Sequence, residues 1–381
     1  MVPTITLNVF NLLILFGAFQ GIILGVILLS TERLRKRSNA YLALMMFVFS
    51  FINLQNTIHA TNLYEVYPIL DLIQLDFVTL IPLSLYFFIT YLLNPNYQIQ
   101  KKEYFFFAFF LLEFCLRLLM LFRHFWYRTD TDSRQQLFYW ISSNTIEFTA
   151  AIITFVLILK AIKKLKHYEK ELYNNYAEIE GRNLSWLRNT FIAGLCLTII
   201  WFFLSLTDYS EEYFSMTLAY TTWLGVSVLI LWIGYSMLIQ QGLLDTTIFA
   251  ISEKPQEPLP PTNELSSKTD EHYERILHFM EVDKLYQNSN LSMSILSEKS
   301  GLSNGYVSQI INQKRKQNFF DFINSYRVED VKQKIIDPNF SHYTLLGLAQ
   351  DAGFKSKSTF NAVFKKMTGK TPSQYRKEET A

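Results

Sequence analysis

The chain has 381 residues, of which half are hydrophobic and 16% are aromatic, and its formal net charge is only +2. A length of about 380 residues suggests two or three ordinary domains. No P-loop, histidine-kinase or Ser-x-x-Lys motif occurs, and the two cysteines and six histidines show no metal-ligand pattern. We therefore expect neither an enzyme nor a bound cofactor or metal.

Apolar runs dominate residues 1–245, which we assign to a membrane domain of seven spanning helices. Residues 1–31 carry no charged side chain, and their apolar run can cross about 30 Å of hydrocarbon at ~1.5 Å per residue. A basic cluster follows this run instead of preceding it, unlike in a secretory signal peptide. The seven predicted spans are Ile5–Leu29, Asn39–His59, Pro68–Leu93, Tyr104–Phe122, Leu137–Leu159, Asn189–Thr207 and Tyr213–Ile239.

Lys and Arg are distributed unevenly between the loops that join these spans. Four basic residues follow the first span and two follow the third, whereas the loops after the second and sixth spans have none. The segment after the fifth span includes Lys163, Lys164, Lys166, Lys170 and Arg182. The three that follow the fourth span are offset by two aspartates. Because positive loops stay in the cytoplasm, this alternation predicts an N-terminus outside and a cytoplasmic chain after Gln240.

The composition changes abruptly after the last span. Residues 252–270 contain four prolines among Glu, Lys, Ser and Thr, which cannot bury a core. We expect residues 246–270 to form an extended cytoplasmic linker, about nineteen residues of which reach up to ~60 Å. The reach of this linker, instead of a rigid joint, should then connect the membrane domain to a soluble domain at 271–381.

Helical spacing of apolar residues marks the soluble domain from Glu271 onward. A first helix carries the apolar residues Tyr273, Ile276, Leu277, Met280 and Leu285 near its inner face. A short second helix then ends at Gly301, which suits the left-handed position after a helix, and Ser303 can cap the next helix. Helix, tight turn and capped helix together predict a helix-turn-helix.

The same arrangement recurs about fifty residues later, after a bridging helix predicted at Phe319–Ile336. The second unit has an apolar face at Leu345, Leu348 and Ala349, a turn at Gly353, a core plug at Phe354 and a cap at Ser356 before a helix through Lys366. The chain ends with Gly369-Lys-Thr-Pro-Ser-Gln-Tyr-Arg.

Two such units on one bridging helix resemble the AraC/XylS family of bacterial transcription regulators. The resemblance covers Tyr273–Lys377, and its motifs are the Ala-x-x-x-Gly-Phe turn at 349–354, Phe364-Lys365-Lys366, and Thr371-Pro372 through Tyr375-Arg376. Ser297 and Val331 stand at packing positions where the family usually has Ala. The resemblance implies a bacterial protein, and with the spans it implies the inner membrane.

The resemblance implies that the second helix of each unit enters the major groove of duplex DNA. Gln309 and Asn361 can each contact adenine with two hydrogen bonds, and Lys357 can donate to guanine. Gly305 and Ala362 have little reach. The residues that we expect to read bases are Asn304, Ser308, Gln309, Lys357, Ser358 and Asn361.

Basic residues surround these helices. Between Glu298 and Ala381 there are fourteen Lys or Arg against eight Asp or Glu. A solvated charged face is the alternative explanation, but the excess fits contacts to phosphates, which give affinity without sequence information. The predicted phosphate contacts are Lys314, Arg315, Lys316, Lys365, Lys366 and Arg376.

Polar residues inside the predicted spans suggest a pocket that is open to the outside, because such groups are costly in a membrane. Glu113 and Arg117 are spaced i, i+4, and the alternative explanation is that the two charges only neutralise each other. The predicted pocket comprises Asn53, Asn56, His59, Asp71, Asp76, Glu113, Arg117 and Glu147.

Together these features predict a membrane-bound one-component transcription regulator that senses a signal in its membrane domain. Its expected partners are duplex DNA, the lipid bilayer, an unknown ligand, RNA polymerase and a second copy of the chain. A transporter or transport-linked sensor with a DNA-binding tail is the alternative. Coupling through dimerisation and proteolytic release of the C-terminal domain both remain open.

Overall fold

The computed structural model describes residues 8–67, 69–70, 77, 79–126, 133–206, 212–239 and 265–380. All regular structure in these ranges is helical, apart from one isolated antiparallel bridge between Tyr176 and Ser292. The all-α prediction is therefore confirmed for the described residues. The chain divides into two compact units: Met1–Lys166 with Leu184–Ala250, and His167–Asn183 with Ile251–Ala381.

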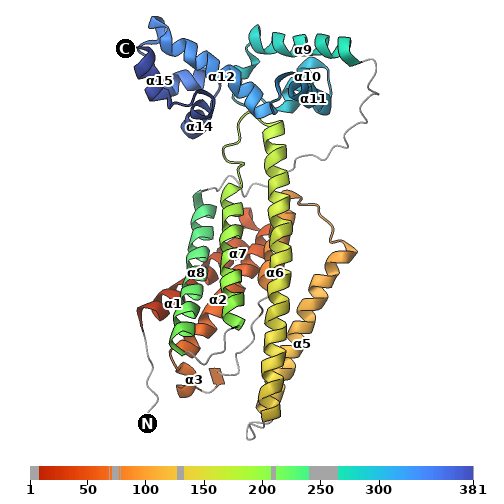
Figure 1. Ribbon diagram of the computed structural model, residues 1–381, viewed down its shortest axis with the longest axis vertical. Helices are drawn as coiled ribbons and strands as arrows, with labels where there is room; N and C mark the ends of the chain where they lie inside the picture. The colour runs from red at the N-terminus through yellow and green to blue at the C-terminus, as the bar shows by residue number, and fades with distance from the viewer. Residues whose placement is uncertain are drawn as a thin grey trace. The chain divides into compact units, whose positions relative to one another are not determined.

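Each of the seven apolar runs contains a helix of the first unit (Figure 1). Within the described part of the chain, two of these helices, α1 and α2, are long and apolar enough to cross a membrane. A bundle of seven spans is thus not established by length and composition. The helices are α1 Val9–Ser30, α2 Arg37–Ala60, α3 Leu63–Val66, α4 Leu80–Leu93, α5 Tyr104–Trp126, α6 Ser133–Asn175, α7 Ser185–Leu206 and α8 Glu212–Ile239.

Two of the predicted boundaries are wrong. The third run was expected to be a span from Pro68 to Leu93, but α4 has only 14 residues, about 21 Å at ~1.5 Å per residue, and begins at Leu80. Helix α6 does not end at Leu159 but continues to Asn175, over 43 residues. Beyond Leu159, buried Ala161, Leu165, Tyr168 and Leu172 repeat at helical spacing between the lysines, so one face continues to pack.

Close packing of α1 depends on three glycines spaced four residues apart. Helix α1 packs against α2 and α8. A Cβ atom at Gly17 would lie 2.5 Å from the Ser227 Cβ on α8, and one at Gly21 would overlap the Ser50 hydroxyl on α2. Glycine therefore lets the three backbones approach closely, as in helix pairs within membranes.

A buried polar cluster holds the segment between α4 and α5. The Glu103 carboxylate is 3% exposed and accepts hydrogen bonds from the Tyr86 hydroxyl at 2.8 Å, the Tyr97 hydroxyl at 2.7 Å and the Gln100 amide at 3.0 Å. Burial by itself would raise the pKa of Glu103, but these donors and the Lys164 ammonium lower it below its usual value. The cluster fixes a loop that follows α4.

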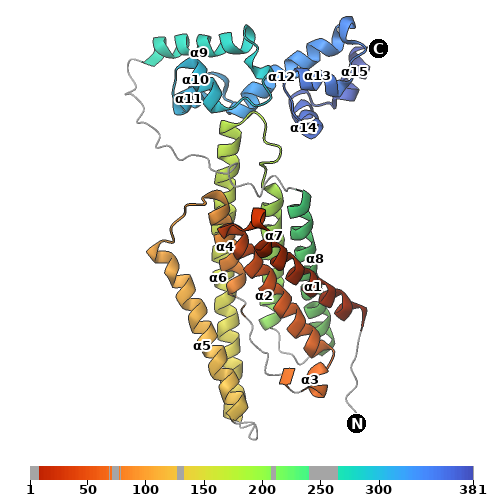
Figure 2. The ribbon, with the colours of Figure 1, turned by 180° about the vertical axis from the view of Figure 1, so that it is seen from behind.

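The second unit contains helices α9 to α15 (Figure 2). Helix α9 begins at Leu265, so residues 265–270 are helical and not extended as expected for the linker. Residues 251–264 lie outside the described ranges. The bridging helix α12 has the predicted bounds. The helices are α9 Leu265–Glu281, α10 Met293–Ser300, α11 Asn304–Arg315, α12 Phe319–Ile336, α13 Leu345–Asp351, α14 Lys357–Thr368 and α15 Pro372–Glu379.

Candidate nucleic-acid interface

Helices α10 and α11 form the first helix-turn-helix. The Ser292 hydroxyl caps α10 by accepting from the Ile295 amide at 3.4 Å, and α10 ends at Gly301 with a left-handed φ of +69°. Ser303 occupies the N-cap position of α11, as predicted, but its side chain makes no capping hydrogen bond. The turn thus follows from Gly301 more than from the cap.

The predicted reading residues of α11 differ in exposure. Asn304 at the start of the helix is exposed, whereas Ser308 and Gln309 are half-buried. The Gln309 Oε1 atom is buried and has no hydrogen-bond partner among the described residues. Of these three residues, Asn304 is therefore the most exposed to solvent.

Helices α13 and α14 form the second helix-turn-helix, joined by the turn at Gly353. The Thr344 hydroxyl caps α13 through the Gly347 amide at 3.0 Å, and the Ser356 hydroxyl caps α14 through the Thr359 amide at 3.1 Å. Gly353 has a φ of +98°, and Phe354 is only 2% exposed. The predicted turn, plug and cap are all confirmed.

Lys357, Ser358 and Asn361 lie exposed on the first turns of α14. The Ser358 hydroxyl donates a 2.8 Å hydrogen bond to the Glu180 carboxylate. Glu178 accepts from the Thr359 hydroxyl at 2.8 Å and from the Lys355 amide at 3.3 Å. Two acidic side chains from the chain between α6 and α7 thus contact the N-terminal end of this helix.

Arg327 on α12 joins the two helix-turn-helix units from within. Its side chain is fully buried and donates from Nε to the Tyr286 carbonyl at 2.8 Å and from an Nη to the Asn288 carbonyl at 2.9 Å. Burial lowers the pKa of Arg327 to about 10, and the Glu178 carboxylate acts in the opposite direction. The guanidinium remains charged at neutral pH and supplies the donor to the buried Tyr286 carbonyl, whereas the Asn288 carbonyl also accepts from the Leu291 amide at 3.0 Å.

Four of the six predicted phosphate contacts are engaged within the protein. Lys314 pairs with Asp270, and Arg315 Nε donates to the Tyr273 hydroxyl at 2.7 Å. Lys366 pairs with Asp321 at 2.7 Å, and Arg376 donates to the Tyr343 carbonyl at 3.0 Å. Three of these contacts are with exposed or half-exposed side chains, so phosphate could replace them at low cost, and the fourth is with a backbone carbonyl. Lys316 and Lys365 are exposed.

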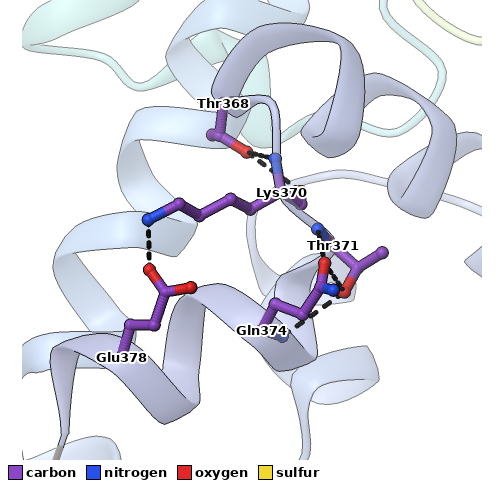
Figure 3. Close-up of polar contacts among 5 residues, drawn as sticks. All are labelled: Thr368, Lys370, Thr371, Gln374 and Glu378. Atoms are coloured by element: carbon purple, nitrogen blue, oxygen red, sulfur yellow. Dashed lines mark hydrogen bonds and ion pairs between the residues drawn. The ribbon is translucent and has the colours of Figure 1, made fainter.

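Polar contacts hold the start of the C-terminal helix α15 (Figure 3). The Thr371 hydroxyl accepts from the Gln374 amide at 3.3 Å, and the Gln374 side chain accepts from the Thr371 amide at 3.0 Å. Pro372 occupies the first turn, where no amide donor is needed. Lys370 also pairs with Glu378. The capping box shows that the Thr-Pro motif starts helix α15.

The predicted polar pocket of the first unit is divided between separate contacts. The Asn53 amide on α2 donates to the Ser227 hydroxyl on α8 at 3.0 Å, and Asn56 bonds to its own helix at the Ile52 carbonyl. Glu113 is buried, accepts from the Thr79 hydroxyl and pairs with Arg117 at 3.4 Å. Arg117 and Glu113 thus pair as their spacing predicts.

The remaining pocket residues add little to this arrangement. The His59 ring lies 5.3 Å from the Tyr64 ring. Asp71 and Asp76 lie outside the described residues, and for Glu147 only the helical backbone is described. A cavity of about 130 Å³ does exist, but its described lining is mainly apolar, with four threonines, and includes none of the predicted residues. Its walls include Met45, Ile52, Leu85, Ile158, Trp223 and Val226.

Sequence reasoning missed Glu178, Glu180, Asn324 and Arg327. Asn324 and Arg327 stand three residues apart on the buried face of α12, and polar residues in an apolar stripe are a usable signal for a buried network. Their partner Ala177 has no such signal, because its contacts to them span about 150 residues of sequence.

Comparison with known proteins supports the assignment of the C-terminal part. A family profile described as a helix-turn-helix domain matches residues 296–378. An uncharacterised HTH-type transcriptional regulator of Staphylococcus aureus strain COL is 33% identical over 98 residues, which are 26% of this chain and 13% of that protein. The regulatory protein SoxS of Escherichia coli K12 is 27% identical over 86 residues, which are 23% of this chain and 78% of SoxS.

The C-terminal part of the chain therefore carries a helix-turn-helix domain. Its relatives place that domain with the AraC type. The chain spans only 13% of the length of the staphylococcal relative. A solved structure of a protein of unknown function from Listeria innocua covers 28% of this chain and 95% of its own at 24% identity, but its TM-score of 0.25 is too low to support an argument.

Proposed function

We propose that the protein is a membrane-bound, one-component transcription regulator. In this proposal, α11 and α14 read successive major grooves of specific DNA, and the first unit senses a signal at the membrane. One observation carries the proposal: a single chain joins two helix-turn-helix units to a helical unit with apolar outer faces.

The apolar outer faces support a membrane location for the first unit. Large hydrophobic side chains are more than half exposed on α1, α5, α7 and α8, where a water-soluble unit would place polar groups. Examples are Val9 at 68%, Phe16 at 61%, Phe105 at 66%, Phe203 at 62% and Val228 at 55% exposed. Lipid is the solvent that suits such faces on several helices at once.

The contacts within the C-terminal unit support DNA binding by both helix-turn-helix units together. Arg327 on α12 and Gly353 in the second helix-turn-helix both contact the loop at Tyr286. Buried contacts therefore set the separation of the two helix-turn-helix units. Fixed spacing is what two reading helices on successive grooves require. Exposed Asn304, Lys357 and Asn361 supply base-reading chemistry on the two helices.

A tagged full-length chain tests both halves of this proposal. It should stay in the membrane fraction through an alkaline carbonate wash and should occupy discrete chromosomal sites in fixed cells. Recovery in the soluble fraction would refute the membrane role, and uniform chromosomal occupancy would refute specific reading.

Sensing is tested separately from anchoring. In a fusion, unrelated membrane spans replace the first unit while residues 167–183 and 251–381 of the C-terminal unit are kept. Transcription from the occupied promoters is then compared across growth conditions. A sensing unit predicts that the fusion loses its response to conditions, whereas unchanged regulation would show that the first unit is only an anchor.

A further inference from the structure

The chain between α6 and α7, residues 176–183, is built into the C-terminal unit. Ala177 is fully buried in the core of the first helix-turn-helix, and its amide donates to the Leu291 carbonyl at 3.3 Å. The Ala177 carbonyl in turn accepts from the Asn324 amide at 3.0 Å. We name residues 176–183 the acidic segment, after Glu178 and Glu180. Its position is fixed by buried contacts, so its acidic side chains are held in place.

Both carboxylates of the acidic segment lie on donors at the N-terminal end of α14. Glu178, which is 9% exposed, accepts from the Lys355 amide just before the helix and from the Thr359 hydroxyl in its first turn. Glu180 accepts from the Ser358 hydroxyl. The amides and hydroxyls at a helix N-terminus are also the groups that bind DNA phosphates, because the helix dipole favours an anion there.

We propose that the acidic segment competes with DNA for α14 and so inhibits DNA binding in the resting protein. This inference rests on the proposed function. A carboxylate bonded to Ser358 places negative charge where a DNA strand approaches, and repulsion between the two anions weakens binding. The segment is therefore an intramolecular occupant of the second reading site.

Chain continuity gives the segment a route for regulation. Helix α6 runs unbroken to Asn175, directly before the acidic segment, and most of its length belongs to the first unit. A change at the C-terminal end of α6 that withdraws Ala177 also withdraws Glu178 and Glu180 from α14. DNA and the membrane signal then act on the same equilibrium, between an acidic segment that is docked on α14 and one that is released from it.

The test uses the full chain in detergent micelles and two probes. One is a duplex that the full chain enriches from a random-sequence library, and the other is a duplex of shuffled sequence. The first variant, Glu180→Ala, changes an exposed side chain. The double variant adds Glu178→Gln, which removes the second negative charge and keeps the side-chain volume. The matched control is Glu274→Ala with Glu281→Gln, two exposed residues of α9.

The inhibited state predicts affinity for the enriched duplex about fivefold higher in Glu180→Ala and about tenfold higher in the double variant, at the low end of allosteric couplings. The affinity of the control should change by less than about twofold. It removes the same net charge from α9 but leaves the contacts of Glu178 and Glu180 with α14 intact. Equal or weaker binding by the double variant would show that the segment only stabilises the domain, and an equal gain in the control would show a general charge effect. Either result overturns the inference.

Hydrogen exchange gives a second, independent measurement. The Glu180 amide donates to the Glu178 carboxylate at 3.1 Å, so displacement of Glu178 by DNA should speed its exchange. Unchanged exchange at saturating DNA would contradict displacement. If neither the native chain nor any variant enriches a sequence, the proposed function itself fails, and the inference with it; binding by the native chain distinguishes the two failures.

Discussion

Gly353→Ala should destabilise the C-terminal unit far more than a chemically identical change at Gly369. Both glycines have left-handed backbones, with φ of +98° and +77°, a conformation that costs a residue with a Cβ about 1–2 kcal/mol. A Cβ at Gly353 would also lie 2.5 Å from the Tyr286 carbonyl oxygen and 2.8 Å from that of Gln287. At Gly369 nothing lies within 4 Å.

The additional cost at Gly353 falls on a buried hydrogen bond. Both clashing atoms are backbone, so the loop must shift, and the Tyr286 carbonyl accepts from Arg327 at 2.8 Å. Weakening a hydrogen bond to a charged group costs about 1.5–3 kcal/mol. The total for Gly353→Ala is therefore about 2.5–5 kcal/mol, against about 1–2 kcal/mol for Gly369→Ala, in a domain whose stability is of order 5–15 kcal/mol.

Hydrogen exchange of the slowest amides of α12, measured in the full chain, reports the free energy of opening in both variants. The expected difference between them is about 1.5–3 kcal/mol, the hydrogen-bond contribution alone. Equal losses in the two variants would refute the reasoning, since they would show that close approach to the Tyr286 loop adds nothing to the backbone strain.

Further substitutions test the reading surface, the core and the first unit. Asn361→Ala should relax preference at one base pair by about 1–3 kcal/mol with nonspecific affinity unchanged in a library selection, and uniform weakening would contradict base reading. Ser297→Ala should slow hydrogen exchange in α10 by about 1 kcal/mol, because the Ser297 hydroxyl is buried without a partner among the described residues. Arg327→Met should cost about 1–3 kcal/mol by removing the donor to the buried Tyr286 carbonyl, and a smaller loss in denaturant would show that water replaces the guanidinium. Gly21→Leu should separate α1 from α2 and lower the melting temperature of the first unit in detergent, whereas Gly194→Leu, with nothing near its Cβ, should not.

Local features of the C-terminal domain could be predicted because their causes are local. The turn at Gly301, the cap at Ser356 and the bounds of α12 each depend on residues within one or two helical turns. The same holds for the Glu113–Arg117 pair. Ser297 and Val331, predicted to be packing positions, are 5% and 0% exposed.

The errors arose where distant parts of the chain decide the structure. The length of α6 was hidden because lysines interrupt its apolar repeat, although Leu165 and Leu172 still pack. No property of the sequence near Glu178 indicates Thr359, which lies 181 residues away. The predicted reading role of Gln309 was weakened by burial of its Oε1 atom, since helical spacing alone does not distinguish an exposed face from a half-buried one.

The chain enters the C-terminal unit twice, at residues 167–183 and again from 251. A protease that cuts once between 251 and 264 would therefore break the covalent tether without freeing helices α9–α15, because Ala177 would still be seated among Leu291, Asn324 and Arg327. Cleavage would turn an intramolecular docking into a bimolecular one, so the fragment would leave only as fast as that noncovalent joint dissociates. Proteolytic release of the C-terminal fragment would then take two steps: cleavage of the chain, followed by slower dissociation of the fragment.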